Sequence, residues 1–216
     1  MKVCGVDEAG RGPVIGPLIV CGVAVDDESK LMELGVRDSK RLTPKRREEL
    51  ATEIRKIARV EVLEIPAEEI DALRDRMSLN EIEARCFATV IGRLDPDHAY
   101  IDAADTDEER FGRMVQTHLG SPVNIISRHK ADDTYPVVSA ASIIAKVERD
   151  RRVREIEQEI GQPIGSGYCT DETTMSFLED WMARNRRLPP HTRRSWEPAQ
   201  TIKRMKGLRR LESFEE

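Results

Sequence analysis

Two short apolar runs near the N-terminus, residues 3–7 and 18–25, constrain the fold more than any other feature of the chain. Both runs contain at least two valines, the second also contains isoleucine, and a stretch of glycine, proline and charged residues separates them. Short apolar runs bounded by glycine and proline are typical of β-strands that pair through a connecting turn. The sequence therefore predicts that the chain begins with a β-hairpin.

The rest of the chain alternates between strand-like and helix-like segments. Capping-box patterns mark two helix starts, at Ser78 with Glu81 and at Thr106 with Glu109, each ahead of an apolar stripe. Strands are predicted at 60–65, 98–104 and 123–127, and helices at about 44–58, 79–94, 107–119, 135–160, 171–185 and 198–210. This alternation, in a chain long enough for one substantial core, predicts an α/β domain with a mixed sheet covered by helices.

The C-terminal part of the chain is strongly basic. Residues 184–210 hold ten basic residues against the single acid Glu197, so this stretch carries +9 and the remainder −14, for a net charge of −5. A basic segment on an acidic body indicates that one end of the molecule meets a polyanion. Solvated faces of C-terminal helices are the alternative explanation.

Composition argues against several protein classes. No run of about 18 apolar residues is present, so no membrane span is expected. The N-terminus lacks the charged, apolar and cleavage regions of a signal peptide. The four cysteines are scattered without a CxxC pair, which favours thiols in a reducing cytoplasm over disulfides or zinc. We therefore expect a cytoplasmic globular protein.

Acidic residues stand at the ends of predicted elements. Asp7 and Glu8 end the first strand, Asp102 ends the short strand that begins at His98, and Asp132 lies just before the long helix. Because loops converge at the strand ends of an open α/β sheet, these acids are expected to meet at one edge. Neighbouring strand residues point to opposite faces, so Asp7 and Glu8 serve one site only if the strand turns there, which the following glycines allow.

Carboxylates without accompanying histidine or cysteine select hard cations, Mg²⁺ or Mn²⁺, over zinc. Two such ions about 3.5–4 Å apart form a clamp for displacement at phosphorus. Each acid also has a structural alternative, since 40 of the 216 residues are acidic. A cap or loop role is favoured for Asp105, and Asp133 is expected to cap a helix or support Asp132. The set, not any one member, indicates a site.

Three further segments are candidates for contacts with a phosphate or a nucleotide. The glycines of Gly10-Arg11-Gly12 allow close approach to a ligand and the arginine offers a fork, although a tight hairpin turn explains the same spacing. Ser39 and Lys40 precede a capped helix and either contact phosphates or form a polar loop. Tyr168 in "GSGY" suits stacking on a base or sugar, or anchoring of its loop.

Together these residues resemble ribonuclease HII of the archaeal kind over most of the chain. Five long segments in the same order carry the resemblance: "GVDEAGRGPVIGPLIV" at 5–20, "VRDSKRLTPKRRE" at 36–48, "DAADTDEERF" at 102–111, "HKADDTYPVVSAASIIAKVERDR" at 129–151 and "GSGYCTDETT" at 165–174. The visible departure is Cys169, because the family usually has proline after this tyrosine.

The resemblance implies a ribonuclease H-like α/β fold, a five-stranded mixed sheet flanked by helices. It further implies a catalytic domain over residues 1–170 and a basic helical extension over 171–216 packed on that domain. The implied activity is cleavage of the RNA strand in RNA–DNA hybrids and incision at single ribonucleotides in duplex DNA. Two divalent ions, Mn²⁺ or Mg²⁺, would act in the reaction and leave 5′-phosphate and 3′-hydroxyl ends.

The resemblance also assigns roles to individual residues. The implied ion ligands and catalytic residues are Asp7, Glu8, Asp102 and Asp132, and the implied substrate contacts are Gly10, Arg11 and Gly12 at the ribose 2′-OH, Ser39 and Lys40 at phosphates, and Tyr168 at the sugar after the scissile linkage. The basic segment 184–210, including Arg193 and Arg194, is expected to hold duplex phosphates.

Two other functions stay open at this point. A resolvase-like DNA nuclease would share the acids but has no use for a 2′-OH reader, and a non-catalytic hybrid-binding module would use the acids as caps. A monomer is expected. A sliding clamp is a further candidate partner, although the terminal "RRLESFEE" with its lone Phe214 only loosely resembles a clamp-binding tail.

Overall fold

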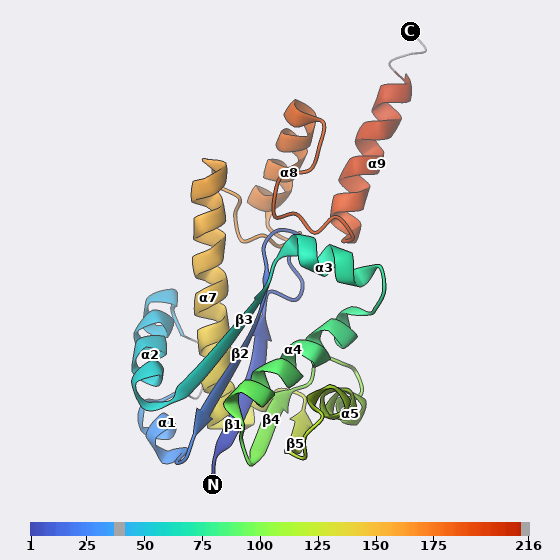
Figure 1. Ribbon diagram of the computed structural model, residues 1–216. Coiled ribbons are helices and arrows are strands. Elements are labelled where there is room, and N and C mark those ends of the chain that lie inside the picture. The colour runs from blue at the N-terminus through green and yellow to red at the C-terminus, as the bar shows by residue number, and fades with distance from the viewer. Residues whose placement is uncertain (37–41, 213–216) are drawn as a thin grey trace. The chain divides into compact units, whose positions relative to one another are not determined.

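The computed structural model describes residues 1–36 and 42–212, with the side chains described as far as residue 205 (Figure 1). The sheet strands are β1 (Val3–Ala9), β2 (Leu18–Val25), β3 (Arg59–Ile65), β4 (His98–Asp102) and β5 (Asn124–Arg128). The helices are α1 (Ser29–Glu33), α2 (Pro44–Ile57), α3 (Ala67–Arg74), α4 (Leu79–Leu94), α5 (Glu108–Leu119), α6 (Ala131–Thr134), α7 (Pro136–Ile160), α8 (Glu172–Asn185) and α9 (Glu197–Glu212).

The five strands form one mixed sheet in the order β3-β2-β1-β4-β5. Strands β1 and β2 pair antiparallel from Val3 opposite Val25 to Ala9 opposite Ile19. Strands β1 and β4, and then β4 and β5, pair in parallel. The predicted N-terminal hairpin and the predicted mixed sheet are therefore confirmed.

The helix starts follow the capping chemistry in one case and depart from it in another. The Ser78 hydroxyl accepts the Glu81 N–H at 3.2 Å, and α4 begins at the next residue, as predicted. The predicted cap at Thr106 is wrong, because Asp107 caps α5 by accepting the Arg110 N–H at 2.9 Å. The Thr106 hydroxyl instead lies 3.3 Å from the Asp105 carboxylate, to which it donates.

The described chain divides into two compact units, which are considered separately below. Unit 1 comprises Met1–Ala9, Ile19–Glu64 and Met77–Arg149, and unit 2 comprises Gly10–Leu18, Ile65–Arg76 and Asp150–Glu216. Each unit combines segments that are distant in sequence. The expected catalytic domain over residues 1–170 with an extension over 171–216 stays a prediction.

In unit 1, helices approach the central strands closely where the sequence has glycine. A Cβ atom at Gly5 of β1 would lie 2.2 Å from the Val137 carbonyl carbon of α7. A Cβ atom at Gly22 of β2 would lie 2.4 Å from Val90 of α4. Gly5 pairs with Val23 rather than with Gly22, so the two glycines belong to different faces of the pleated sheet. Helix α7 therefore packs on the Gly5 face and α4 on the Gly22 face.

Unit 2 has its own apolar core, built from the chain around Val14 and Ile15, the end of α7, and helices α8 and α9. Phe177 and Leu178 of α8 are buried in this core, as is Ala199 of α9. Across the described residues of both units, no helix is both long and apolar enough to cross a membrane.

Candidate metal centre and substrate-binding loops

Strands β1 and β4 bring Asp7 and Asp102 together. Val6 of β1 lies opposite Ile101 of β4 in the parallel register, so Asp7 and Asp102 follow at the same level on neighbouring strands. Asp7 shares the face of Gly5, two residues earlier, which is the face covered by α7. Asp102 is the last residue of β4 and Asp7 lies two residues before the end of β1. Both acids therefore stand near the carboxyl ends of adjacent parallel strands, where the sequence predicted that they would meet.

Asp132 reaches the same place through the turn that follows β5. Lys130 adopts a left-handed backbone conformation (φ 55°), and its N–H donates to Asp102 Oδ1 at 3.1 Å. Helix α6 begins directly afterwards at Ala131, which puts Asp132 in its first turn. The hydrogen bond from Lys130 thus fixes the start of α6 against the end of β4.

The three aspartates form a compact cluster. One carboxylate oxygen from each of Asp7, Asp102 and Asp132 lies within 4.8 Å of the other two. The residues Asp7 and Asp132 are only 6% and 5% exposed, so water screens their charges weakly. Carboxylates packed this closely repel one another unless a cation or a proton lies between them. The all-oxygen donor set fits a hard divalent cation such as Mg²⁺ or Mn²⁺.

The ionisation of Asp7 reflects this crowding. Burial of the carboxyl group and the nearby Asp102 carboxylate raise the pKa of Asp7 from 3.8 to about 7. Ser142 and Lys146 of α7 act in the opposite direction, since the serine hydroxyl donates to Asp7 and the lysine ammonium is close enough to lower its pKa. The Lys146 Nζ atom donates to Ser142 Oγ at 2.8 Å, which orients the hydroxyl.

Ser142 and Lys146 were not predicted from the sequence as site residues. They stand four residues apart on a helix that is otherwise small and apolar around them, in "SIIAK" at 142–146. Residues with this spacing lie on the same helix face. The sequence signal that could have identified them is a pair of polar side chains on the helix face that packs against the sheet.

Glu8 is not part of the described three-acid cluster. Strand β1 continues to Ala9, so alternation sends Glu8 to the face opposite Asp7. The Glu8 N–H donates to Asp7 Oδ1 at 2.8 Å, which is a backbone contact. The turn expected directly after Asp7 is therefore displaced to Gly10, and the metal role of Glu8 stays a prediction.

Asp105 has a structural environment. Its carboxylate accepts hydrogen bonds from Asn80 Nδ2 at 2.7 Å, from the Asp107 N–H at 3.0 Å, and from the Arg110 guanidinium through Nε at 3.1 Å. These donors hold the pKa of Asp105 well below its usual range. The expected cap or loop role fits these contacts.

In unit 2, the Gly10-Arg11-Gly12 segment lies beside the Tyr168 loop. A Cβ atom at Gly12 would lie 3.5 Å from the Tyr168 ring, an ordinary van der Waals distance. The N–H groups of Val14 and Ile15 donate to the Gly167 carbonyl at 2.8 and 3.2 Å. Two of the predicted substrate-binding segments therefore meet. The third, Ser39 with Lys40, lies outside the described residues.

The expected phosphate role of Arg193 does not agree with its position. The Arg193 residue is 0% exposed, and its guanidinium donates to the carbonyl oxygens of Gly10, Arg11 and Gly16. Arg194, the next residue, behaves differently, because its side chain lines a basic cleft. Of these two consecutive arginines, Arg193 is therefore buried and Arg194 lies at the surface of the cleft.

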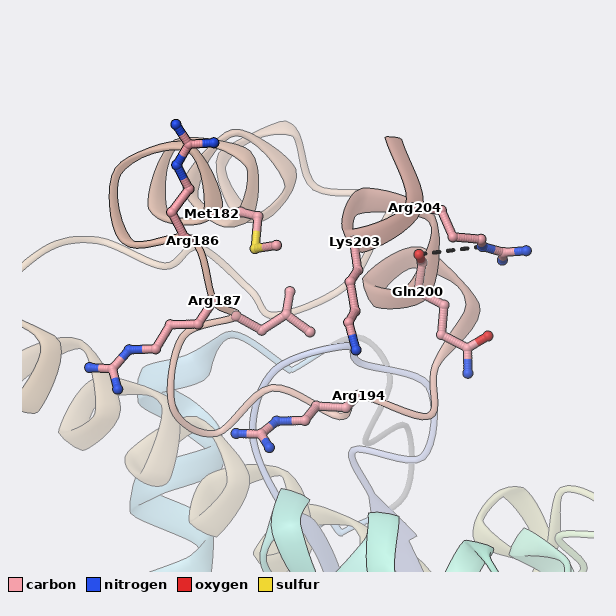
Figure 2. Close-up of a pocket in the computed structure, with 8 residues that line it drawn as sticks. Met182, Arg186, Arg187, Arg194, Gln200, Lys203 and Arg204 are labelled. Atoms are coloured by element: carbon pink, nitrogen blue, oxygen red, sulfur yellow. Dashed lines mark hydrogen bonds between the residues drawn. The ribbon is translucent and has the colours of Figure 1, made fainter. Parts of the chain in front are cut away.

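The basic cleft of unit 2 measures about 860 Å³ and is lined by residues from α8, α9 and the intervening loop: Met182, Arg186, Arg187, Leu188, Arg194, Gln200, Lys203 and Arg204. The lining holds five cationic side chains and no acid. Figure 2 shows Lys203 pointing from α9 toward Arg194, with Arg187 on the side of α8. Arg204 turns to the outer side of α9, where Figure 2 marks the bond from its Nε atom to the Gln200 carbonyl oxygen at 3.4 Å. Arg204 Nη2 also donates to Glu197 Oε1 at 2.9 Å.

A mixed five-stranded sheet with clustered acids near the carboxyl ends of two adjacent parallel strands defines an α/β domain of the ribonuclease H-like class. The ribonuclease HII family matches residues 4–199. A ribonuclease HII from Methanothrix thermoacetophila is 48% identical over 206 residues, which cover 94% of this chain and 98% of the relative.

Solved structures agree with this assignment. The ribonuclease H2 of Pyrococcus horikoshii is 42% identical with a TM-score of 0.89, over 95% of this chain and 98% of that one. The ribonuclease HII of Archaeoglobus fulgidus, solved in complex with PCNA, is 46% identical with a TM-score of 0.86, over 91% of this chain and 96% of that one. The chain belongs to the ribonuclease HII family and is a metal-dependent ribonuclease H of type 2.

Proposed function

We propose that this enzyme hydrolyses the RNA strand of RNA–DNA hybrids and incises duplex DNA at single embedded ribonucleotides, leaving 5′-phosphate and 3′-hydroxyl ends. The observation that carries the proposal is the cluster of Asp7, Asp102 and Asp132, whose oxygens lie within 4.8 Å of one another. Phosphate binding alone calls for cations, so three acids at this spacing support a site for divalent ions and not a simple polyanion-binding surface.

The acids of the cluster would bind the ions, and neighbouring residues would orient those acids. Asp7, Asp102 and Asp132 would hold two divalent cations, with Glu8 as a further ligand. When bound, such ions supply an activated water and neutralise charge that builds on the leaving 3′-oxygen. Ser142 and the N–H of Glu8 hold the Asp7 carboxylate in place, because both donate to it.

Selection of RNA would depend on the Gly10-Arg11-Gly12 segment and Tyr168. The 2′-hydroxyl distinguishes RNA from DNA at a given position, and main-chain N–H groups can contact it without adding bulk. Gly12 lies against the Tyr168 ring, which is 37% exposed and thus accessible to a sugar. Their proximity supports a common role in recognising one nucleotide.

The basic cleft of unit 2 would hold duplex phosphates. Arg187, Arg194 and Lys203 repel one another when no anion is present, so a polyanion between them is favoured. Contacts of this kind provide affinity that depends on salt and carries little sequence preference. Ser39 and Lys40 are proposed as further phosphate contacts near the cleaved strand.

Two partner assignments complete the proposal. The Archaeoglobus fulgidus relative was solved with PCNA, which supports a sliding clamp as a partner of this chain as well. The candidate contact is the terminal segment with Phe214, which lies outside the described residues. We further propose that the enzyme acts as a monomer in the cytoplasm.

Cleavage of three matched duplexes tests the proposal: all DNA, a full RNA–DNA hybrid, and DNA with one ribonucleotide. With Mg²⁺ or Mn²⁺ the second and third should be cut, with 3′-hydroxyl ends, and the first should stay intact. Asp102→Asn should abolish cleavage. Asp95→Asn is a matched control, because Asp95 is an exposed acid in a left-handed conformation that asparagine tolerates. Equal cutting of the all-DNA duplex would favour the resolvase-like alternative.

A further inference from the structure

The buried guanidinium of Arg193 is hydrogen-bonded to the loop that contains Gly10-Arg11-Gly12, the proposed 2′-hydroxyl contact. Its Nη2, Nη1 and Nε atoms donate to the carbonyl oxygens of Gly10 at 2.5 Å, Arg11 at 2.8 Å and Gly16 at 3.0 Å. The Trp196 ring lies against the same group, 4.8 Å from Arg193 Cζ. One side chain thus connects three carbonyls of a single loop.

Burying a guanidinium is costly unless hydrogen bonds replace its hydration. Its planar fork carries several donors in fixed directions, which suits several carbonyls at once. Lysine has a single nitrogen and cannot reach oxygens spread along the loop from Gly10 to Gly16. The three bonds therefore require arginine, and they favour one conformation of this loop.

The backbone that carries Arg193 is itself fixed. Its N–H donates to the Val14 carbonyl at 2.8 Å, so the two segments are joined by main-chain contacts as well. On the other side, the Asp71 carboxylate accepts the N–H groups of Arg194 at 2.7 Å and Ser195 at 2.9 Å. The guanidinium thus projects from a rigid support.

The directions of these carbonyl groups also determine the directions of the neighbouring N–H groups. In a trans peptide the C=O of one residue and the N–H of the next point in opposite directions. Because the Gly10 and Arg11 carbonyls point to Arg193, the N–H groups of Arg11 and Gly12 point away from it. Gly12 also lies against the Tyr168 ring, so the residue that carries one of these two donors lies next to the proposed sugar-stacking side chain.

We propose that Arg193 is a positioning residue for ribonucleotide recognition: it orients the Arg11 and Gly12 amides toward the ribose 2′-hydroxyl. The inference rests on the proposed function of Gly10-Arg11-Gly12. It assigns Arg193 to specificity, in contrast to Arg194, whose side chain lines the basic cleft and serves affinity for any duplex.

The test measures dissociation constants in EDTA for two matched duplexes, one all DNA and one with a single ribonucleotide. The ribonucleotide preference is the dissociation constant of the all-DNA duplex divided by that of the duplex with one ribonucleotide. Arg193→Lys and Arg193→Met should each lower this ratio by about tenfold or more, the equivalent of one lost hydrogen bond of about 1.4 kcal/mol. Arg194→Ala should weaken both complexes equally and leave the ratio unchanged.

Each outcome bears on a different claim. A wild-type ratio of one would refute the proposed 2′-hydroxyl recognition itself, and the role of Arg193 with it. A wild-type preference that Arg193→Met retains would overturn the positioning role alone, as would a loss shared equally by both duplexes. If neither Arg193 variant folds, Trp196→Leu keeps the guanidinium and removes the ring beside it. For Trp196→Leu the proposal requires that the ratio falls, but by less than the tenfold expected of the Arg193 variants. An unchanged ratio refutes it.

Discussion

Replacing Asp7 by asparagine should make the metal-free enzyme more stable and catalytically inactive at once. Asparagine has nearly the shape of aspartate and keeps an oxygen to accept the Glu8 N–H. It removes one negative charge from a cluster whose members lie within 4.8 Å of each other. The substitution therefore relieves repulsion in the absence of ions and removes a ligand in their presence.

The magnitude follows from the pKa of Asp7, which is raised from 3.8 to about 7. Between these pH values the native state binds a proton that the unfolded chain has released, so the free energy of unfolding falls as the pH rises. At 1.36 kcal/mol for each pKa unit, the loss reaches about 4 kcal/mol above pH 7. We expect metal-free Asp7→Asn to match wild type near pH 4 and to exceed it by up to about 4 kcal/mol at pH 8.

Urea denaturation in EDTA at pH 4 and pH 8 measures this difference, and cleavage of a ribonucleotide-containing duplex in Mg²⁺ measures the lost activity. Asp95→Asn is the matched control, because it removes an exposed acid outside the cluster. A metal-free Asp7→Asn variant that is less stable than wild type at pH 8 would refute the electrostatic reasoning. Retained cleavage would remove Asp7 from the site.

Three further variants test the roles of Tyr168, the basic cleft and Asp105. Tyr168→Ala should slow cleavage at a single ribonucleotide by about tenfold or more through lost stacking of about 1–3 kcal/mol, with wild-type thermal stability; an unchanged rate would exclude the stacking role. Arg187→Ala with Arg194→Ala should weaken duplex binding and reduce the slope of affinity against salt by about two, as measured by titration at several salt concentrations. Asp105→Ala should lower the free energy of unfolding by about 1–2 kcal/mol, because the partly exposed donors of Asn80 and Asp107 lose the buried carboxylate that accepts from them, and should leave metal affinity unchanged.

Much of the fold could be predicted from local sequence chemistry. The hairpin followed from two apolar, valine-containing runs around a glycine-rich turn, and α4 followed from Ser78 and its apolar stripe. Helices α1, α3 and α6 were missed because each has eight residues or fewer, which is too short for a clear 3.6-residue period. The cap of α5 was misplaced because Asp105, a distant partner of Asn80, engages the Thr106 hydroxyl.

The site was predictable to a similar extent. Asp7 and Asp102 lie near the carboxyl ends of adjacent parallel strands, so strand positions sufficed to place them together, although β1 runs two residues beyond Asp7. The role of Ser142 depends on how α7 packs on the sheet, which no local pattern gives. Arg193 was wrongly expected at the surface because it lies in a run of basic residues. Its side chain is buried because it donates to the carbonyl oxygens of Gly10 and Arg11, which are distant in sequence.

Calorimetric titration of the enzyme with Mn²⁺ and with Mg²⁺ tests the central claim most directly, namely that Asp7, Asp102 and Asp132 form a divalent-cation site. We predict saturable binding by wild type that is weakened in Asp102→Asn and lost when all three aspartates are replaced by asparagine, with Asp95→Asn unchanged. Wild-type affinity in the triple variant would contradict the account.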